Sequence, residues 1–151
     1  KYYSMTGWRL GWMVVPKDLH RAVECLAQNL FISPPAISQQ AGLAAFDCAD
    51  ELEQNVRHYA RNRDLLLQKL PQAGFTRLAP ADGAFYIYAD VSELTNDATD
   101  FCRRMLAETG VAATPGVDFD PTRGHQFVRF SFAGSEQEIA LAAEKLLTWK
   151  R

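Results

Sequence analysis

Apolar residues recur at helical spacing over three stretches of the chain. The first stretch runs from Lys17 to Leu30 and ends near two successive prolines, which disfavour helical geometry in the residue before each. Pro35 can then open a second helix through 36–49, because the first turn of a helix does not need its missing N–H. The third stretch ends at Pro71 and Gly74. It has a single apolar stripe with charged residues on either side, which predicts a long helix that connects two parts of the protein. Its stripe consists of Leu52, Val56, Tyr59, Arg63, Leu66 and Leu70.

Short runs of β-forming residues predict strands on both sides of the long helix. Gly11–Val15, bounded by Pro16, is typical of a buried strand. After Gly74, short strands and helices alternate, which predicts a small α/β layer. The strands are expected over 75–78, 84–89, 110–114 and 126–133, with one helix over about 97–108 and a last helix after Ser135. Ser135 and Glu138 form the sequence pattern of a capping box at the start of that last helix.

Composition places the chain among ordinary water-soluble folded domains and excludes several classes of function. The chain has 151 residues, of which 48% are hydrophobic and 23% charged, with a formal charge of −2. No sustained basic stripe offers a nucleic-acid surface, and no apolar run is long enough to cross a membrane. Three cysteines far apart, with no CxxC pair, predict reduced thiols in a cytoplasmic protein and no zinc site. The histidines share no metal-binding spacing, and His58 is expected to be an ordinary surface residue of a helix.

The opening KYYSMTGWRLGW carries the strongest chemical signal. It has no initiator Met and lacks the apolar run of a signal peptide, which predicts that the sequence begins inside a longer protein. A lysine amine can form a Schiff base with an aldehyde cofactor such as pyridoxal phosphate. The guanidinium of Arg9 offers a rigid fork for the phosphate of such a cofactor, and Gly7 and Gly11 allow close backbone approach.

The order of motifs resembles the fold type I, class I/II aminotransferases, of the aspartate aminotransferase type. Lys1 to Gly11 is similar to the family's lysine signature, and PADGAFYIY to its Gly-x-Phe-Tyr strand. GVAATPGVDFD is similar to the Val-x-x-x-Pro-Gly-x-x-Phe loop, although Asp118 and Asp120 depart from it and are interpreted as turn residues. VRFSFA matches the Arg-x-Ser strand. These motifs cover nearly the whole chain in the family's order.

The resemblance implies a role for three residues. Lys1 would be the catalytic Schiff-base lysine and proton carrier, Arg9 would hold the cofactor phosphate, and Arg129 would bind the α-carboxylate of the substrate. Strand alternation puts Val128, Phe130 and Phe132 on one face and Arg129 on the other. Without the motif, a solvated strand residue would be the favoured interpretation of Arg129, and an exposed terminal lysine that of Lys1. No metal is implied.

The resemblance also implies a fold and an assembly. Residues 1–50 would be the C-terminal tail of a large pyridoxal phosphate-binding domain, residues 51–74 a long connecting helix, and residues 75–151 a small C-terminal α/β domain. The protein would be a homodimer, with Ser33 and Ile37 toward its interface, acting on an amino acid and a 2-oxo acid. The groups that protonate and stack the cofactor ring are not among these 151 residues, so we expect the isolated chain to be inactive.

Two alternatives share these motifs. A related pyridoxal phosphate lyase would use the same lysine and arginines, since its chemistry starts from the same bound substrate. A transcriptional regulator with an aminotransferase-like sensing domain would carry them next to a DNA-binding module. A structural domain without chemistry would leave the pattern from Lys1 to Gly11 unexplained.

Overall fold

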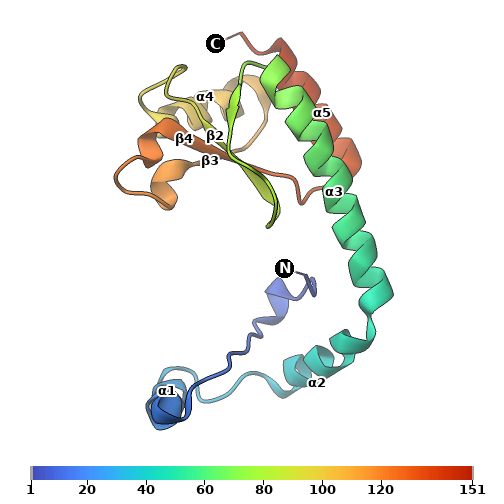
Figure 1. Cartoon of the computed structure of the whole chain (residues 1–151), viewed down its shortest axis with the longest axis vertical. Coiled ribbons are helices and arrows are strands. Elements are labelled where there is room, and N and C mark those ends of the chain that lie inside the picture. The colour runs from blue at the N-terminus through green and yellow to red at the C-terminus, as the bar shows by residue number, and fades with distance from the viewer. Residues whose placement is uncertain (1, 151) are drawn as a thin grey trace. The chain divides into compact units, whose positions relative to one another are not determined.

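The chain folds as two compact units that meet within one long helix. A computed structural model describes residues 2–150. The first unit ends at Val56 and the second begins at Arg57, inside helix α3 (Ala49–Gln72) (Figure 1). The long helix predicted from the stripe of alternating four- and three-residue spacing is therefore confirmed.

Two shorter helices make up most of the first unit. Helix α1 spans Lys17–Leu30, as the apolar spacing predicts. Helix α2 spans Ala36–Ala44 with Pro35 as its N-cap, so it is shorter than the predicted 36–49, because Ala45–Asp47 form a 3-10 turn. The predicted strand over Gly11–Val15 is wrong: these residues form no strand, and the Val14 side chain is 89% exposed. A buried strand needs neighbours to pair with, and the described residues of the first unit contain no other strand.

The first unit has little core of its own. Within residues 2–56 only Ser38 and Leu52 are buried. The apolar stripe of α1 is exposed at Leu19, Leu26 and Leu30. The described residues of this unit thus leave much apolar surface uncovered.

The second unit is built on a four-stranded antiparallel sheet with the order β1-β2-β4-β3. The strands are β1 (Arg77–Leu78), β2 (Tyr86–Asp90), β3 (Thr114–Pro115) and β4 (Phe127–Ser131). The two central strands lie where the sequence predicts them. The outer two are shorter than predicted, because only two residues of each pair with a neighbour. The strand expected over 110–114 thus pairs only at its end.

Helices cover one face of this sheet. Helix α4 spans Ala98–Thr109 and helix α5 spans Glu136–Thr148, and α5 lies beside α3 in Figure 1. Helix α4 begins where the sequence predicts, with Asp97 as its N-cap, and the predicted capping box of Ser135 and Glu138 is present at α5. The core between helices and sheet includes Leu66, Leu70, Phe75, Ile87, Phe101, Met105, Val128, Phe130 and Leu146.

The C-terminal end of α3 is fixed by its backbone. Pro71 lies inside the last turn and does not itself end the helix. The N–H of Gly74 donates to the carbonyl of Pro71 and the N–H of Phe75 to that of Leu70 at 2.9 Å. This pair of bonds is a Schellman motif, for which Gly74 takes the left-handed φ of 84°. The motif turns the chain so that Phe75 enters the core.

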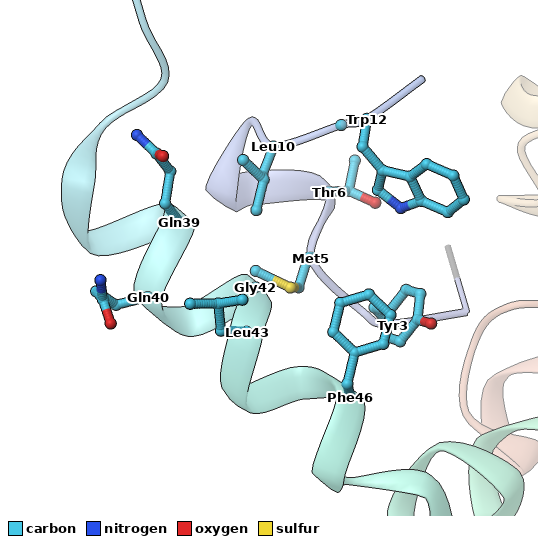
Figure 2. Close-up of a pocket in the computed structure, with 11 residues that line it drawn as sticks. Tyr3, Met5, Thr6, Leu10, Trp12, Gln39, Gln40, Gly42, Leu43 and Phe46 are labelled. Atoms are coloured by element: carbon cyan, nitrogen blue, oxygen red, sulfur yellow. The ribbon is translucent and has the colours of Figure 1, made fainter. Parts of the chain in front are cut away.

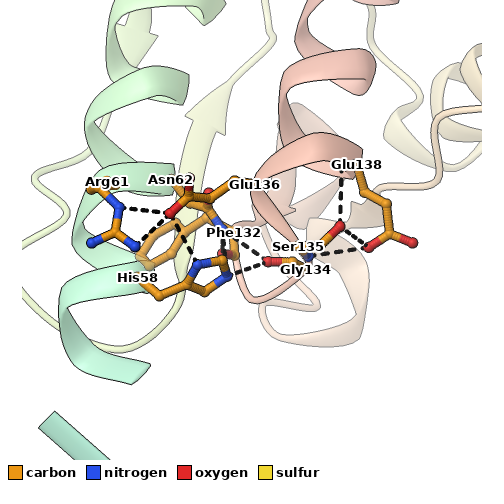
Figure 3. A network of polar contacts seen from close by, with 8 residues as sticks. All are labelled: His58, Arg61, Asn62, Phe132, Gly134, Ser135, Glu136 and Glu138. Carbon is orange, nitrogen blue, oxygen red and sulfur yellow. Dashed lines mark hydrogen bonds and ion pairs between the residues drawn. The ribbon is translucent and has the colours of Figure 1, made fainter. Parts of the chain in front are cut away.

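A polar network ties α3 to the turn between β4 and α5 (Figure 3). Asn62 Nδ2 donates to the carbonyl oxygens of Phe132 at 3.0 Å and Gly134 at 2.9 Å. His58 Nε2 lies 2.8 Å from the Gly134 carbonyl oxygen, and Nδ1 lies 3.3 Å from Glu136 Oε1. The expectation of an ordinary surface histidine is therefore wrong for His58, because helical spacing does not reveal a partner 76 residues away.

Candidate active site

Arg129 lies on the face of the sheet opposite the helical core. Its neighbours Val128 and Phe130 are buried on the core side, whereas Arg129 is half-buried on the other side. The predicted alternation along β4 is therefore confirmed. The antiparallel register places Tyr88 of β2 and Thr114 of β3 directly across from Arg129, so side chains from three strands meet at this position.

The guanidinium of Arg129 is held mainly by aromatic rings. Its Cζ lies 4.5 Å from the ring centroid of Phe119 and 5.2 Å from that of Tyr86. Nη2 donates a hydrogen bond of 3.3 Å to Thr114 Oγ1. An aromatic face attracts the guanidinium but does not accept hydrogen bonds from the N–H groups that lie in the guanidinium plane. These contacts therefore fix the guanidinium and leave N–H donors unused.

Arg129 has no carboxylate partner among residues 2–150, where every ion pair found involves other side chains. Its buried Nε also has no acceptor within the described chain. A buried N–H without an acceptor costs about 1–3 kcal/mol, and an acceptor carried by a ligand would remove that cost. The arrangement suits a carboxylate, whose two oxygens match the fork of a guanidinium.

Phe119 is carried by a compact loop between β3 and β4. The carbonyl oxygen of Gly116 accepts from the N–H groups of Phe119 and Asp120, both at 2.9 Å. The Asp120 carboxylate accepts from the N–H groups of Thr122 and Arg123, and these bonds lower the pKa of Asp120 below its ordinary value. The turn role predicted for Asp120 is thus confirmed, and the loop holds its shape through its own backbone.

Beside Arg129 on the same face, Tyr88 stacks on Phe127 with the two ring planes 1° apart. Its hydroxyl is buried and has no partner among the described residues. Burial raises the pKa of Tyr88, and the nearby charge of Asp120 raises it further. The phenol is therefore neutral at physiological pH and available as a hydrogen-bond donor.

The predicted phosphate-binding residue lies in the first unit, and Lys1 lies outside the described residues. Arg9 is exposed, and its Nη1 donates to the carbonyl oxygen of Thr6 at 3.2 Å. Arg9 and Ser4 both adopt left-handed backbone, with φ of 53° and 52°. Such conformations are uncommon for residues other than glycine and are often found at functional sites.

Arg9 and Ser4 line one hollow of about 480 Å³, whose other walls are Gly7, Trp8, Pro35, Ile37 and Ser38. A guanidinium and hydroxyl groups are donors suited to a phosphate, so this set fits the anionic group of the cofactor. A Cβ on Gly7 would meet no atom within 4 Å, so packing within the described chain does not require glycine there. Its predicted role in admitting a cofactor stays a prediction.

A second hollow of about 640 Å³ lies between the segment around Leu10 and helix α2 (Figure 2). Tyr3, Met5, Leu43 and Phe46 give it a mainly apolar lining, and Gln39 and Gln40 add amide groups. It contains neither Arg9 nor a charged side chain. The two hollows therefore differ in chemistry, and only that of Arg9 suits an anion.

Other kinds of site are not found in the part of the chain that the structure describes. Residues 2–150 contain no cluster of three or more potential metal ligands. No helix among them combines the length and the apolar character of a membrane span.

Sequence reasoning missed the residues that surround Arg129. Thr114, Tyr86 and Phe119 come from three separate segments, and only the folded sheet and loop bring them to the guanidinium. The one available signal is the motif Pro-Gly-x-x-Phe, in which Phe119 is the final residue.

Comparison with known proteins identifies the family. The profile of the family described as aminotransferase class I and II matches residues 1–146. Valine–pyruvate aminotransferase of Mycobacterium tuberculosis is 53% identical over 99% of this chain, and aspartate/prephenate aminotransferase of Thermus thermophilus is 37% identical over 96%. The crystal structure of an aminotransferase from Mycobacterium tuberculosis matches 99% of the chain with a TM-score of 0.94 and 53% identity.

The matches also show how much of each relative's length this chain covers. It spans 39% of the length of the valine–pyruvate aminotransferase and 37% of the aspartate/prephenate enzyme. It covers 39% of the matched crystal structure. Members of this family depend on pyridoxal phosphate, and the α/β fold corresponds to the C-terminal part of aspartate aminotransferase-like structures. From the profile, the relatives and the structural match together, the chain belongs to the class I and II aminotransferases.

Proposed function

We propose that these residues are the C-terminal portion of an aminotransferase that moves an amino group from an amino acid to a 2-oxo acid. The observation that carries the proposal is the state of Arg129. Its guanidinium is oriented by Phe119, Tyr86 and Thr114, yet it has no acidic partner among the described residues and an Nε without an acceptor. A strand arginine fixed in this way is suited to bind the α-carboxylate shared by amino acids and 2-oxo acids.

The first unit would supply part of the cofactor site. Arg9 would bind the phosphate of pyridoxal phosphate, with Ser4 lining the same hollow. Lys1 would hold the cofactor covalently and carry a proton to and from the substrate α-carbon. When bound, pyridoxal phosphate supplies an electron sink for that carbon. Residues 1–50, 51–74 and 75–151 would then be the tail of the large domain, the connecting helix and the small domain.

The full protein would be a cytoplasmic homodimer. The exposed apolar side chains of the first unit, including those of α1, support a surface that further protein covers. The isolated chain would be inactive and bind the cofactor weakly, because it represents only 39% of the length of its relatives. Titration of the chain with pyridoxal phosphate checks this point: stoichiometric uptake with imine absorbance would contradict it.

The names of the relatives rank the candidate amino-group donors and acceptors. Valine and pyruvate come first, since the relative named for them is 53% identical to this chain. Aspartate comes next, because two other relatives at 29% and 32% identity are named aspartate aminotransferases.

The test is amino transfer by the full-length protein with a panel of donors and two acceptors, pyruvate and 2-oxoglutarate. We expect transfer by the unchanged protein, loss of transfer in Lys1→Ala, and a KM raised about tenfold to hundredfold in Arg129→Lys. Arg103→Lys, an exposed arginine of α4, serves as the matched control and should leave KM unchanged. Elimination products without transfer would favour a lyase and contradict the proposal.

A further inference from the structure

We infer that Phe119 is a positioning residue that sets the orientation of the Arg129 guanidinium for an incoming carboxylate. The inference rests on the proposed function, since it concerns the same carboxylate. In this role Phe119 neither contacts the carboxylate nor takes part in the reaction. It acts only through its contact with Arg129.

The first step is the balance of contacts on the guanidinium. Thr114 supplies its one hydrogen bond among the described residues, and at 3.3 Å this bond is long. The ring of Phe119 is the nearer of the two aromatic rings, at 4.5 Å against 5.2 Å for Tyr86. A side chain with so little hydrogen bonding depends on the ring that covers it for a fixed orientation.

The second step is the exposure of Phe119. Its side chain is 53% exposed, so burial in the core does not explain the position of a large apolar ring. Among the described residues, its ring is in contact with the guanidinium of Arg129. The ring leaves the edges of the guanidinium, where N–H groups point, open to a ligand that approaches in the plane.

The third step is the loop that presents the ring. Gly116 and Gly124 lie in mutual backbone contact at its two ends: a Cβ on Gly116 would be 2.6 Å from the Gly124 carbonyl oxygen and 2.5 Å from Tyr88 Oη. With the bonds to Gly116 and Asp120 described above, this contact closes the loop over Tyr88. The loop thus holds Phe119 against Arg129 before a ligand binds. Because this arrangement is already formed, less conformational entropy is lost when the carboxylate binds.

The experiment compares Phe119→Leu with Phe119→Tyr in the full-length protein. Leucine keeps apolar bulk but lacks the aromatic face, and tyrosine keeps that face. Val117→Ala, in the same loop and partly exposed, is the control for changes of the loop itself. Acetate serves as a non-reacting carboxylate probe, and its inhibition constant against the amino-acid donor is measured beside KM and kcat. Hydrogen exchange of the Arg129 Nε–H, followed by NMR in the full-length protein without added cofactor, reports the state of the guanidinium independently of activity.

We expect Phe119→Leu to raise KM and the acetate inhibition constant about fivefold to tenfold, with kcat within about twofold, and to speed Nε–H exchange. Phe119→Tyr and Val117→Ala should stay near the unchanged protein in every measurement. Unchanged constants and exchange in Phe119→Leu would overturn the inference. Arg129→Lys separates the two claims. If Arg129→Lys weakens acetate binding and Phe119→Leu does not, only the inference about Phe119 fails. If neither substitution weakens acetate binding, the proposed function fails. Thermal unfolding of each variant verifies that the fold is kept.

Discussion

The side-chain amide of Asn62 donates a hydrogen bond of 3.0 Å to the main-chain carbonyl of Phe132, 70 residues further along the chain. Asn62 is 1% exposed, and the same Nδ2 also reaches the Gly134 carbonyl. The bond connects the middle of α3 to the segment that follows the strand of Arg129. The polar network of Figure 3 is therefore part of the support of the candidate site.

Replacing Asn62 by leucine should destabilise the second unit by about 1–3 kcal/mol, because the buried Phe132 carbonyl loses its side-chain donor. Urea unfolding followed by circular dichroism measures the change. Gln68→Leu is the matched control, since Gln68 is an exposed amide on the same helix, and it should stay within about 0.5 kcal/mol. Equal effects of the two substitutions would show that the buried hydrogen bond adds nothing to the free energy of unfolding beyond what an exposed amide adds.

Gly124→Ala should disrupt the loop that carries Phe119. A Cβ at this position would overlap the backbone of Gly116 and Val117, so the chain must move, at a cost of about 1–3 kcal/mol. Gly83→Ala is the control, because a Cβ there meets nothing within 4 Å. The melting temperature and the KM of the full-length protein check both effects. A Gly124→Ala protein with both values unchanged would mean that the loop does not need this contact.

Acid should destabilise the second unit partly through Glu136. Hydrogen bonds from Arg61, at 2.6 Å, and from His58 lower the pKa of Glu136 below its ordinary value. Its folded pKa is thus below its unfolded one, so its contribution is present above about pH 4.3 and is lost as pH falls through the folded pKa. Glu136→Gln should reduce the fall in melting temperature between about pH 6 and pH 3. Asp82→Asn, at an exposed loop position, should leave that fall unchanged.

Cys102 should resist thiol reagents in the folded chain. Burial raises the pKa of its thiol to about 11, and the side chain is 7% exposed. Because the thiolate is the reactive form, labelling near neutral pH should proceed first at Cys25 and Cys48, which are half-buried. Mass spectrometry of partly labelled protein identifies the order. Early modification of Cys102 would mean that its part of the core opens readily.

Local signals in the sequence were sufficient for most helices. The Ser135 and Glu138 pair and the cap at Asp97 act on their own first turns, so no distant contact decides these starts. Strands depend on partners. For that reason the prediction of a strand over Gly11–Val15 is wrong, and the strand predicted over 110–114 pairs only at Thr114. The face of Arg129 followed from alternation alone, because β4 is a central strand with a buried side.

The surroundings of the site could not be predicted in the same way. The contact of Phe119 with Arg129 depends on how the loop from Gly116 to Gly124 closes, and that closure depends on backbone contacts and not on a residue pattern. His58 likewise meets Gly134 only because α3 and the turn before α5 are adjacent in the folded chain. Motif resemblance makes Arg129 a candidate, and the structure adds the residues that contact its guanidinium.

The most direct test of the central claim is a crystal structure of the full-length protein with an unreactive carboxylate analogue of an amino acid bound beside the cofactor. Our account predicts that both oxygens of the α-carboxylate lie about 2.7–2.9 Å from nitrogens of Arg129. A carboxylate bound by another cation, with the guanidinium of Arg129 left facing solvent, would contradict it.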